Sequence, residues 1–97
     1  MIKKEYPKSR QVCKVTFYTP KLKAETVQLV GDFNNWELMA SPMQKLSDKR
    51  FKLIIELEKG KEYQYRFFVD QKEWLNDPEA DRCAINEFGS ENCIIVT

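Results

Sequence analysis

The sequence contains no histidine. This absence removes the commonest general base, the base of Ser–His and Cys–His nucleophilic pairs, and the commonest metal ligand. Its three cysteines, Cys13, Cys83 and Cys93, are far apart, have no C-x-x-C spacing and are odd in number. They therefore predict neither a metal site nor a disulfide framework, and we expect free, buried thiols in a reducing compartment.

Long apolar runs are also missing. No stretch approaches the roughly 20 apolar residues that a membrane-spanning helix needs. The charged residues 1–10 are not followed by the apolar segment of a secretory signal. We therefore expect a cytoplasmic protein with no membrane partner.

Charge of one sign does not dominate, because the formal net charge is +1 over 97 residues. Residues 1–25 carry seven Lys or Arg against two Glu, and residues 73–91 carry one Arg against six Asp or Glu. A nucleic-acid-binding protein usually has a denser basic stripe, so we expect no nucleic-acid partner. Both charged ends are typical of solvated surface, although the basic end also suits contact with an acidic partner.

The length predicts one domain over residues 1–97, with residues 1–10 as a loosely held basic segment. Short runs with period-two alternation are separated by turn residues, and no amphipathic helix is evident, so an all-β sandwich or barrel is predicted. Residues 79–91 are expected to form a long polar loop. The expected inward side chains are Cys13, Val15, Phe17, Val27, Leu29, Phe51, Leu53, Ile55, Leu57, Tyr63, Tyr65, Phe67 and Val69.

Two tryptophans lie beside turns and near the ends of predicted strands, with Trp74 in the short predicted strand Glu73-Trp74-Leu75. Trp36 follows the turn residues 31–35, and Trp74 precedes Asn76-Asp77-Pro78. A flat indole outside a core suits a sugar, because the C–H face of a pyranose stacks on an aromatic ring. The alternative is that either indole covers the edge of a small core.

Four other residues have the chemistry of a sugar site, each with an ordinary alternative. Arg66, on the polar face of the longest predicted strand, has a planar fork that matches vicinal hydroxyls, or pairs with a carboxylate. Phe88 precedes Gly89 and either plugs the core or reaches a ligand. Ser90 and Asn92 offer donors and acceptors to a ligand, or hold the loop.

Catalytic residues are not evident. Asp and Glu are numerous, but they are scattered over turns and outward strand positions. Glycoside cleavage needs two carboxyl groups placed across a cleft, so we expect a protein that is not an enzyme. We also expect no metal and no cofactor.

Four stretches in order resemble the family 48 carbohydrate-binding modules, which include the glycogen-binding domain of the AMP-activated protein kinase beta subunit. They are Val27-Gln28-Leu29-Val30-Gly31-Asp32-Phe33-Asn34-Asn35-Trp36, Tyr63-Gln64-Tyr65-Arg66-Phe67-Phe68-Val69-Asp70, Trp74-Leu75-Asn76-Asp77-Pro78 and Phe88-Gly89-Ser90-Glu91-Asn92. Together they span residues 27–92. The chain is most similar to the stand-alone bacterial members, in which no catalytic domain is attached.

The resemblance implies an immunoglobulin-like antiparallel β-sandwich of the early-set type. It implies non-catalytic binding of an α-1,4-linked glucan, such as glycogen, starch, a maltooligosaccharide or a cyclodextrin-like ring, with a glycogen-metabolising enzyme as the candidate protein partner. The site residues carried over by the resemblance are Trp36, Arg66, Trp74, Phe88, Ser90 and Asn92.

The chain also departs from the family pattern. Many members have Asp-Gly in the hairpin before the second tryptophan, whereas this chain has Asp70-Gln71-Lys72-Glu73. This loop is one residue longer than in the kinase version, so we expect Trp74 to point in a different direction. The alternative function is a protein–protein interaction or regulatory module that has kept the sandwich without binding sugar.

Overall fold

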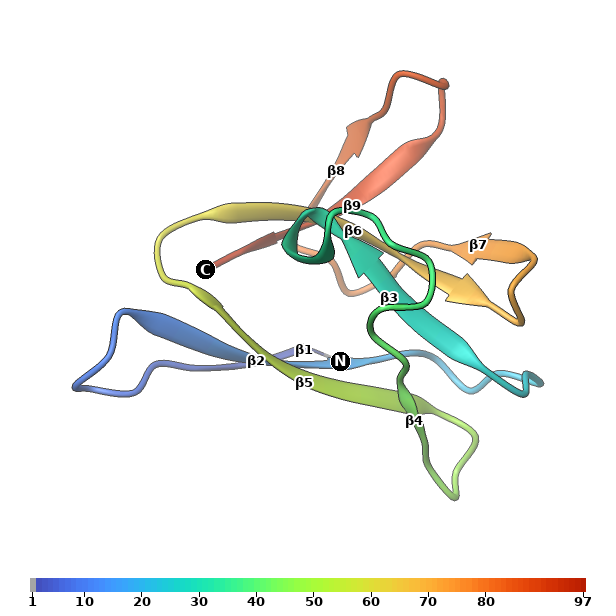
Figure 1. The fold of residues 1–97 in the computed structure, drawn as a ribbon, viewed down its shortest axis with the longest axis horizontal. Helices are drawn as coiled ribbons and strands as arrows, with labels where there is room; N and C mark the ends of the chain where they lie inside the picture. Colours follow the sequence, from blue (N-terminus) through green and yellow to red (C-terminus); the bar gives the residue numbers. More distant parts are fainter. Residues whose placement is uncertain (1) are drawn as a thin grey trace.

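The computed structural model describes residues 2–97, which form nine strands in two antiparallel sheets packed face to face (Figure 1). In this part of the chain no helix has the length and apolar character needed to cross a membrane. The elements are β1 (Ile2–Glu5), β2 (Val12–Tyr18), β3 (Val27–Gly31), the 3-10 turn η1 (Asp32–Asn34), β4 (Gln44–Lys45), β5 (Phe51–Glu58), β6 (Glu62–Val69), β7 (Glu73–Leu75), β8 (Arg82–Ile85) and β9 (Glu91–Val96).

Strand β6 organises the second sheet. The first sheet has the order β1-β2-β5-β4, and the second has the order β3-β6-β9-β8. Gly31 of β3 and Cys93 of β9 both pair with Tyr65 of β6, so β3 and β9 lie on opposite sides of β6. Strand β7 pairs with the end of β6 beyond β9. The predicted all-β antiparallel sandwich is confirmed.

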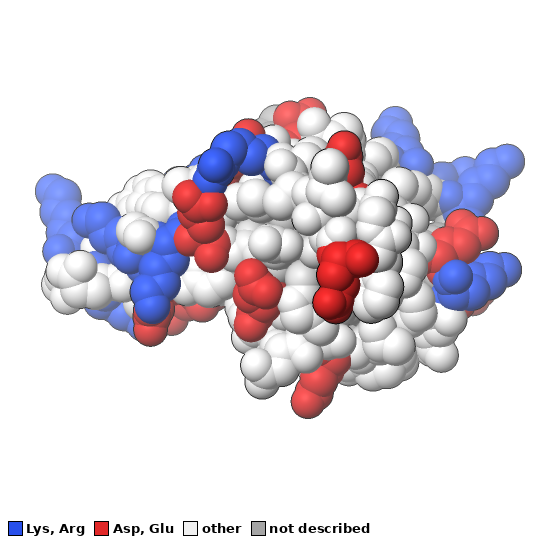
Figure 2. Space-filling view, turned by 90° about the horizontal axis from the view of Figure 1, so that it is seen from above, with Lys and Arg blue, Asp and Glu red and all other residues white. Residues whose placement is uncertain are grey.

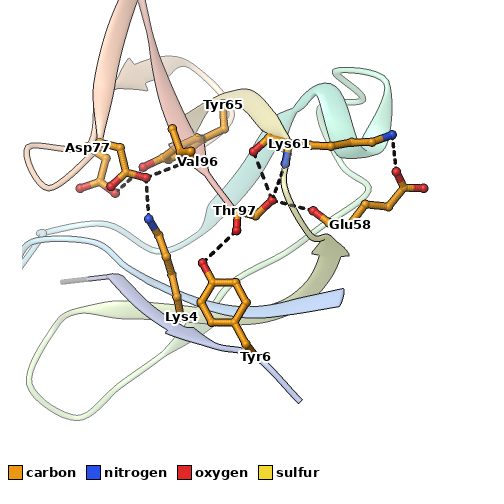
Figure 3. A network of polar contacts seen from close by, with 9 residues as sticks. Lys4, Tyr6, Glu58, Lys61, Tyr65, Asp77, Val96 and Thr97 are labelled. Carbon is orange, nitrogen blue, oxygen red and sulfur yellow. Dashed lines mark hydrogen bonds and ion pairs between the residues drawn. The ribbon is translucent and has the colours of Figure 1, made fainter. Parts of the chain in front are cut away.

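The core forms where alternate side chains of both sheets meet, and the expected inward positions are confirmed. Tyr65 is fully buried, and its ring meets Phe17 of the facing sheet edge-on with centroids 4.9 Å apart. Its hydroxyl donates to Asp77 Oδ2 at 2.8 Å (Figure 3), because a buried phenol needs a partner. Burial, followed by the Asp77 carboxylate, raises the pKa of Tyr65.

The N-terminal segment contains a strand that its composition does not predict. Strand β1 pairs with β2, Lys4 Nζ lies 2.7 Å from Asp81 Oδ2, and the Tyr6 hydroxyl donates to the Thr97 carbonyl at 2.9 Å (Figure 3). Residues 2–6 therefore have defined partners on β2, Asp81 and Thr97, whereas the looseness expected of residues 1–10 stays a prediction, and Met1 lies outside the described residues. Ile2 packs against the core, while the surrounding lysines obscure this short strand in the sequence.

The stretch 79–91 is not one long loop. Residues 82–85 form β8, whose hairpin with β9 projects from the body of the sandwich (Figure 1). Because β8 is an edge strand, Cys83 is exposed, which corrects the expectation that it is buried. Cys13 and Cys93 are free and buried, as expected.

Gly31 is required by a close approach of strands. Its backbone is extended, and a Cβ at this position would lie 2.4 Å from the Gln64 carbonyl oxygen. We therefore expect Gly31→Ala to lower the free energy of unfolding by about 1–3 kcal/mol, because neither backbone can move away without breaking the β3–β6 ladder. Urea unfolding measures this loss.

Gly60→Asn is the matched control. Gly60 has a φ of +77° and open space around it, and asparagine tolerates this left-handed conformation better than most residues. Its expected loss is below about 1 kcal/mol. Equal losses in the two variants would show that crowding against β6 is not what requires glycine at position 31.

Candidate functional site

A strained turn after β3 directs Trp36 away from the core. Asn35 and Trp36 both adopt left-handed backbone conformations, with φ of 57° and 58°. The Trp36 N–H donates to the Gly31 carbonyl at 2.9 Å. The Asn34 side chain accepts the Gly31 N–H at 3.1 Å and donates to the Leu29 carbonyl at 2.9 Å. These bonds hold a backbone conformation that is unfavourable for a bulky residue.

The carboxylate of Asp32 fixes the indole of Trp36 to strand β6. Asp32 Oδ1 accepts the indole Nε1–H of Trp36 at 3.0 Å, and Oδ2 accepts the backbone N–H of Gln64 at 2.8 Å. One carboxylate thus joins the turn and the strand through two charge-assisted hydrogen bonds. Asp32 is a positioning residue for Trp36.

Trp74 is held from the neighbouring strand by an aromatic ring and a guanidinium. Its ring centroid lies 4.7 Å from that of Phe68, its cross-strand partner, and Arg66 Cζ lies 5.3 Å from the Trp74 ring. Arg66 Nε also donates to Asn76 Oδ1 at 2.8 Å. Arg66 takes part in none of the five ion pairs found in residues 2–97, so its observed partners are an amide and an indole.

Phe88 lies at the tip of the β8–β9 hairpin with 85% of its surface exposed, so it does not plug the core. The Asn86 N–H donates to the Ser90 carbonyl at 2.7 Å, and the Gly89 N–H donates to the Asn86 carbonyl at 3.1 Å. Asn86 Oδ1 accepts the N–H groups of Phe88 and Ser90. Gly89 has a left-handed conformation, with φ of +80°, which is typical of a three-residue hairpin loop with a bulge.

Asn92 connects this hairpin to β6. Its side chain is 7% exposed, its Nδ2 donates to Gln64 Oε1 at 2.9 Å, and its Oδ1 accepts from Asn86 Nδ2 at 3.1 Å. The amide chain Gln64–Asn92–Asn86 therefore sets the position of the loop that carries Phe88. Ser90 is exposed, and its backbone N–H and carbonyl form its hydrogen bonds with Asn86.

These elements enclose one groove with a volume of about 680 Å³. Five of the six predicted site residues line it, and Ser90 does not. The lining residues are Asp32, Trp36, Gln64, Arg66, Trp74, Ile85, Asn86, Glu87, Phe88 and Asn92.

Sequence reasoning did not find five of these lining residues. Gln64 shares the outward face of its strand with Arg66, a two-residue spacing that the sequence displays. Asp32 stands four residues before Trp36, but only the folded turn brings its carboxylate to the indole. Ile85, Asn86 and Glu87 lie in the region that was expected to be a plain loop.

The groove presents aromatic and amide surface with few charges. Its charged residues are Asp32, Arg66 and Glu87. Figure 2 looks onto the side from which the β8–β9 hairpin projects, and shows Lys and Arg gathered toward the two ends of this face, with Asp and Glu over its middle. Such a surface suits an uncharged ligand better than a polyanion.

A second depression, of about 560 Å³, lies around the loop between β4 and β5 and the segment before β3. It is lined by Leu22, Lys23, Ala24, Glu25, Lys45, Leu46, Ser47 and Lys49. It has no aromatic lining and contains none of the predicted site residues.

Together, the antiparallel sandwich and its open aromatic groove define the class of a small β-sandwich binding module. The chain belongs to the family described as the glycogen recognition site of AMP-activated protein kinase, whose sequence profile matches residues 15–97. This is a family of non-catalytic carbohydrate-binding modules, and the membership confirms the resemblance drawn from the four motifs. A search of curated proteins finds no match.

The hairpin before Trp74 is stabilised by hydrogen bonds to the Asp70 carboxylate, and their strength depends on pH. Asp70 and Gln71 are both left-handed, and Asp70 Oδ1 accepts the N–H groups of Thr26 at 3.0 Å and Glu25 at 2.8 Å. These backbone bonds lower the pKa of the Asp70 carboxyl below its ordinary value of 3.8. The ionised carboxylate therefore stabilises the hairpin above that ordinary value, and its contribution is lost as the pH falls through the lowered pKa.

We expect the side-chain carboxyl of Asp70 to titrate with a midpoint below 3.8 in a carbon-detected NMR experiment. The environment of Trp74 should change over the same pH range, because protonation weakens the acceptor at the turn. In Asp70→Asn, which has no proton to gain, this step in Trp74 fluorescence should disappear. A midpoint at or above 3.8 would contradict the assigned hydrogen bonds.

Proposed function

We propose that this protein binds a chain of α-1,4-linked glucose of the glycogen or starch type in the groove, without breaking a bond. The observation that supports this most strongly is the convergence of Trp36, Trp74 and Phe88 from three separate segments of the chain on one groove. Membership of a family of glycogen-recognition domains points to the same ligand class.

The aromatic part of binding is stacking on rings that are already in place. The C–H faces of successive glucose units would lie on the two indoles, where the negative face of the ring attracts those hydrogens. Asp32 restrains Trp36, and Phe68 with Arg66 restrains Trp74. Little side-chain freedom would then be lost on binding, which favours affinity in a shallow site.

We assign the polar part of binding to the arginine and amide side chains that line the groove. The guanidinium of Arg66 offers N–H donors to vicinal hydroxyls, and Gln64 and Asn86 offer amide groups. Asn92 is buried in its bonds to Gln64 and Asn86, so we assign it mainly to positioning. Ser90 lies outside the groove, and its hydroxyl would meet only a chain that extends past the hairpin tip.

Such a small, partly polar interface should bind in the micromolar to millimolar range, equivalent to roughly −8 to −4 kcal/mol. We propose that the protein is not an enzyme and brings a partner, such as a glycogen-metabolising enzyme, to the polymer in the cytoplasm. Several modules acting together would raise the apparent affinity for a polymer with many chain ends.

Isothermal titration with maltoheptaose and with β-cyclodextrin tests the proposal. We expect saturable binding by the native protein and at least tenfold weaker binding by the Trp36→Ala, Trp74→Ala double variant, equivalent to about 1.4 kcal/mol or more. Phe88→Ala should also weaken binding, and because Phe88 is 85% exposed, it should leave the urea unfolding midpoint nearly unchanged.

The matched control is Tyr18→Ala. Tyr18 lies in β2 of the opposite sheet, and Arg50 Cζ stands 4.9 Å from its ring, so it reproduces the pairing of arginine and aromatic ring away from the groove. Its affinity should equal that of the native protein. If the native protein binds no sugar at millimolar concentration, the glucan proposal fails and a protein-docking module becomes the leading account.

A further inference from the structure

Two of the three cysteines face one another across the β8–β9 hairpin. Cys83 and Cys93 are directly paired in the register of the two strands. The bond from the Asn86 N–H to the Ser90 carbonyl marks Asn86 and Ser90 as a hydrogen-bonded pair. Hydrogen-bonded and non-hydrogen-bonded pairs alternate along an antiparallel ladder, so Cys83 and Cys93, three steps further along, form a non-hydrogen-bonded pair.

The geometry of such a pair is compatible with a disulfide. Residues opposed at non-hydrogen-bonded positions have Cα atoms about 4.5 Å apart, and their side chains leave the same face of the sheet. Disulfides are found with Cα separations of about 4.4–6.8 Å. Cys83 and Cys93 therefore meet the distance requirement without a change of register.

The two thiols differ in access, as an attacking and a resolving cysteine do. Cys83 is exposed on the edge strand, whereas Cys93 is fully buried and its Sγ accepts the Asp77 N–H at 3.0 Å. Burial raises the pKa of the Cys93 thiol to about 11, which protects it from reacting first. Cys13 is buried in the other sheet opposite Leu57, so it has no such partner.

We propose that Cys83 and Cys93 are an oxidant-sensitive pair that closes to a cross-strand disulfide in the presence of a small-molecule disulfide. The Cys83 thiolate attacks the oxidant, whose S–S bond breaks and releases one thiol. Cys93 then loses its proton to solvent and attacks the sulfur of Cys83, releasing the second thiol. Two protein thiols are oxidised, and one small disulfide is reduced to two thiols.

The consequence for the groove rests on the proposed glucan binding. The hairpin that the disulfide closes carries Ile85, Glu87 and Phe88 on the groove wall. A cross-link between its strands removes open conformations of this wall, so less ordering is needed when a ligand binds. The oxidised protein should therefore bind glucan several-fold more tightly than the reduced protein.

The first experiment is a non-reducing peptide map after the full chain has been incubated with glutathione disulfide. The expected product is a monomer with Cys83 linked to Cys93 and a mass lower by two hydrogens. Cys13→Ser should give the same link, and Cys93→Ser should stop at a glutathione adduct on Cys83. A native protein that stops at this adduct, or that links other cysteines, would overturn the proposal.

The second experiment titrates maltoheptaose into the reduced and the oxidised native protein, with oxidant-treated Cys83→Ser as the control. Tighter binding only in the oxidised native protein supports the link to the groove, and equal affinities overturn it. The peptide map does not depend on sugar. Absence of binding in both redox forms would therefore refute the glucan proposal. The disulfide proposal would still be decided by the peptide map alone.

Discussion

The groove depends on the carboxylate of Asp32, which holds the Trp36 indole with one oxygen and the backbone of β6 with the other. Without this link, the turn that carries Trp36 would still be joined to the second sheet by β3, by the bonds of Asn34 and by the contact of Phe33 with Tyr63, but no bond would hold the indole itself to β6. The left-handed conformation of Trp36 carries a cost that the surrounding hydrogen bonds must offset. Asp32 therefore converts a strained turn into one fixed wall of the groove.

The other two walls of the groove, which carry Trp74 and Phe88, are also held in place by contacts with β6. Trp74 packs on Phe68 and beneath the guanidinium of Arg66, both of which lie on this strand. The hairpin that carries Phe88 is tied to Gln64 through Asn92. Three segments that are distant in sequence thus take their positions from one strand, which explains how a sandwich of 97 residues can form a defined site.

The two faces of strand β6 contribute to different parts of the protein, one to the core and the other to the groove. Its inward residues, such as Tyr65 and Phe67, are buried between the sheets, and its outward residues Gln64 and Arg66 face the groove. The two-residue period of a strand makes this division possible within eight residues. Substitutions on the outward side should consequently change recognition with little effect on the core.

Much of this arrangement can be predicted from the sequence, because the alternation of apolar and polar residues and the spacing of aromatic residues are local properties. The inward positions of β2, β3, β5 and β6, the strand β7 and the location of Trp36 and Trp74 were predicted in this way. Strands β1 and β8 were not, since each is a four-residue edge strand rich in charged or small residues. The roles of Asp32 and of the amide chain through Asn92 depend on contacts between distant segments, which no local pattern encodes. The same long-range geometry leaves Ser90 outside the groove.

The central claim is that a glucan lies against the three walls that β6 positions. Nitrogen-15 NMR of the native protein during titration with maltoheptaose tests it most directly, because each wall has its own reporter. The account predicts shifts of both indole Nε1–H signals, of Arg66 and of the amides of residues 85–92, with the amides of β1, β2 and β5 unchanged. Shifts concentrated on β1, β2 and β5, or saturation that leaves both indole signals in place, would contradict it.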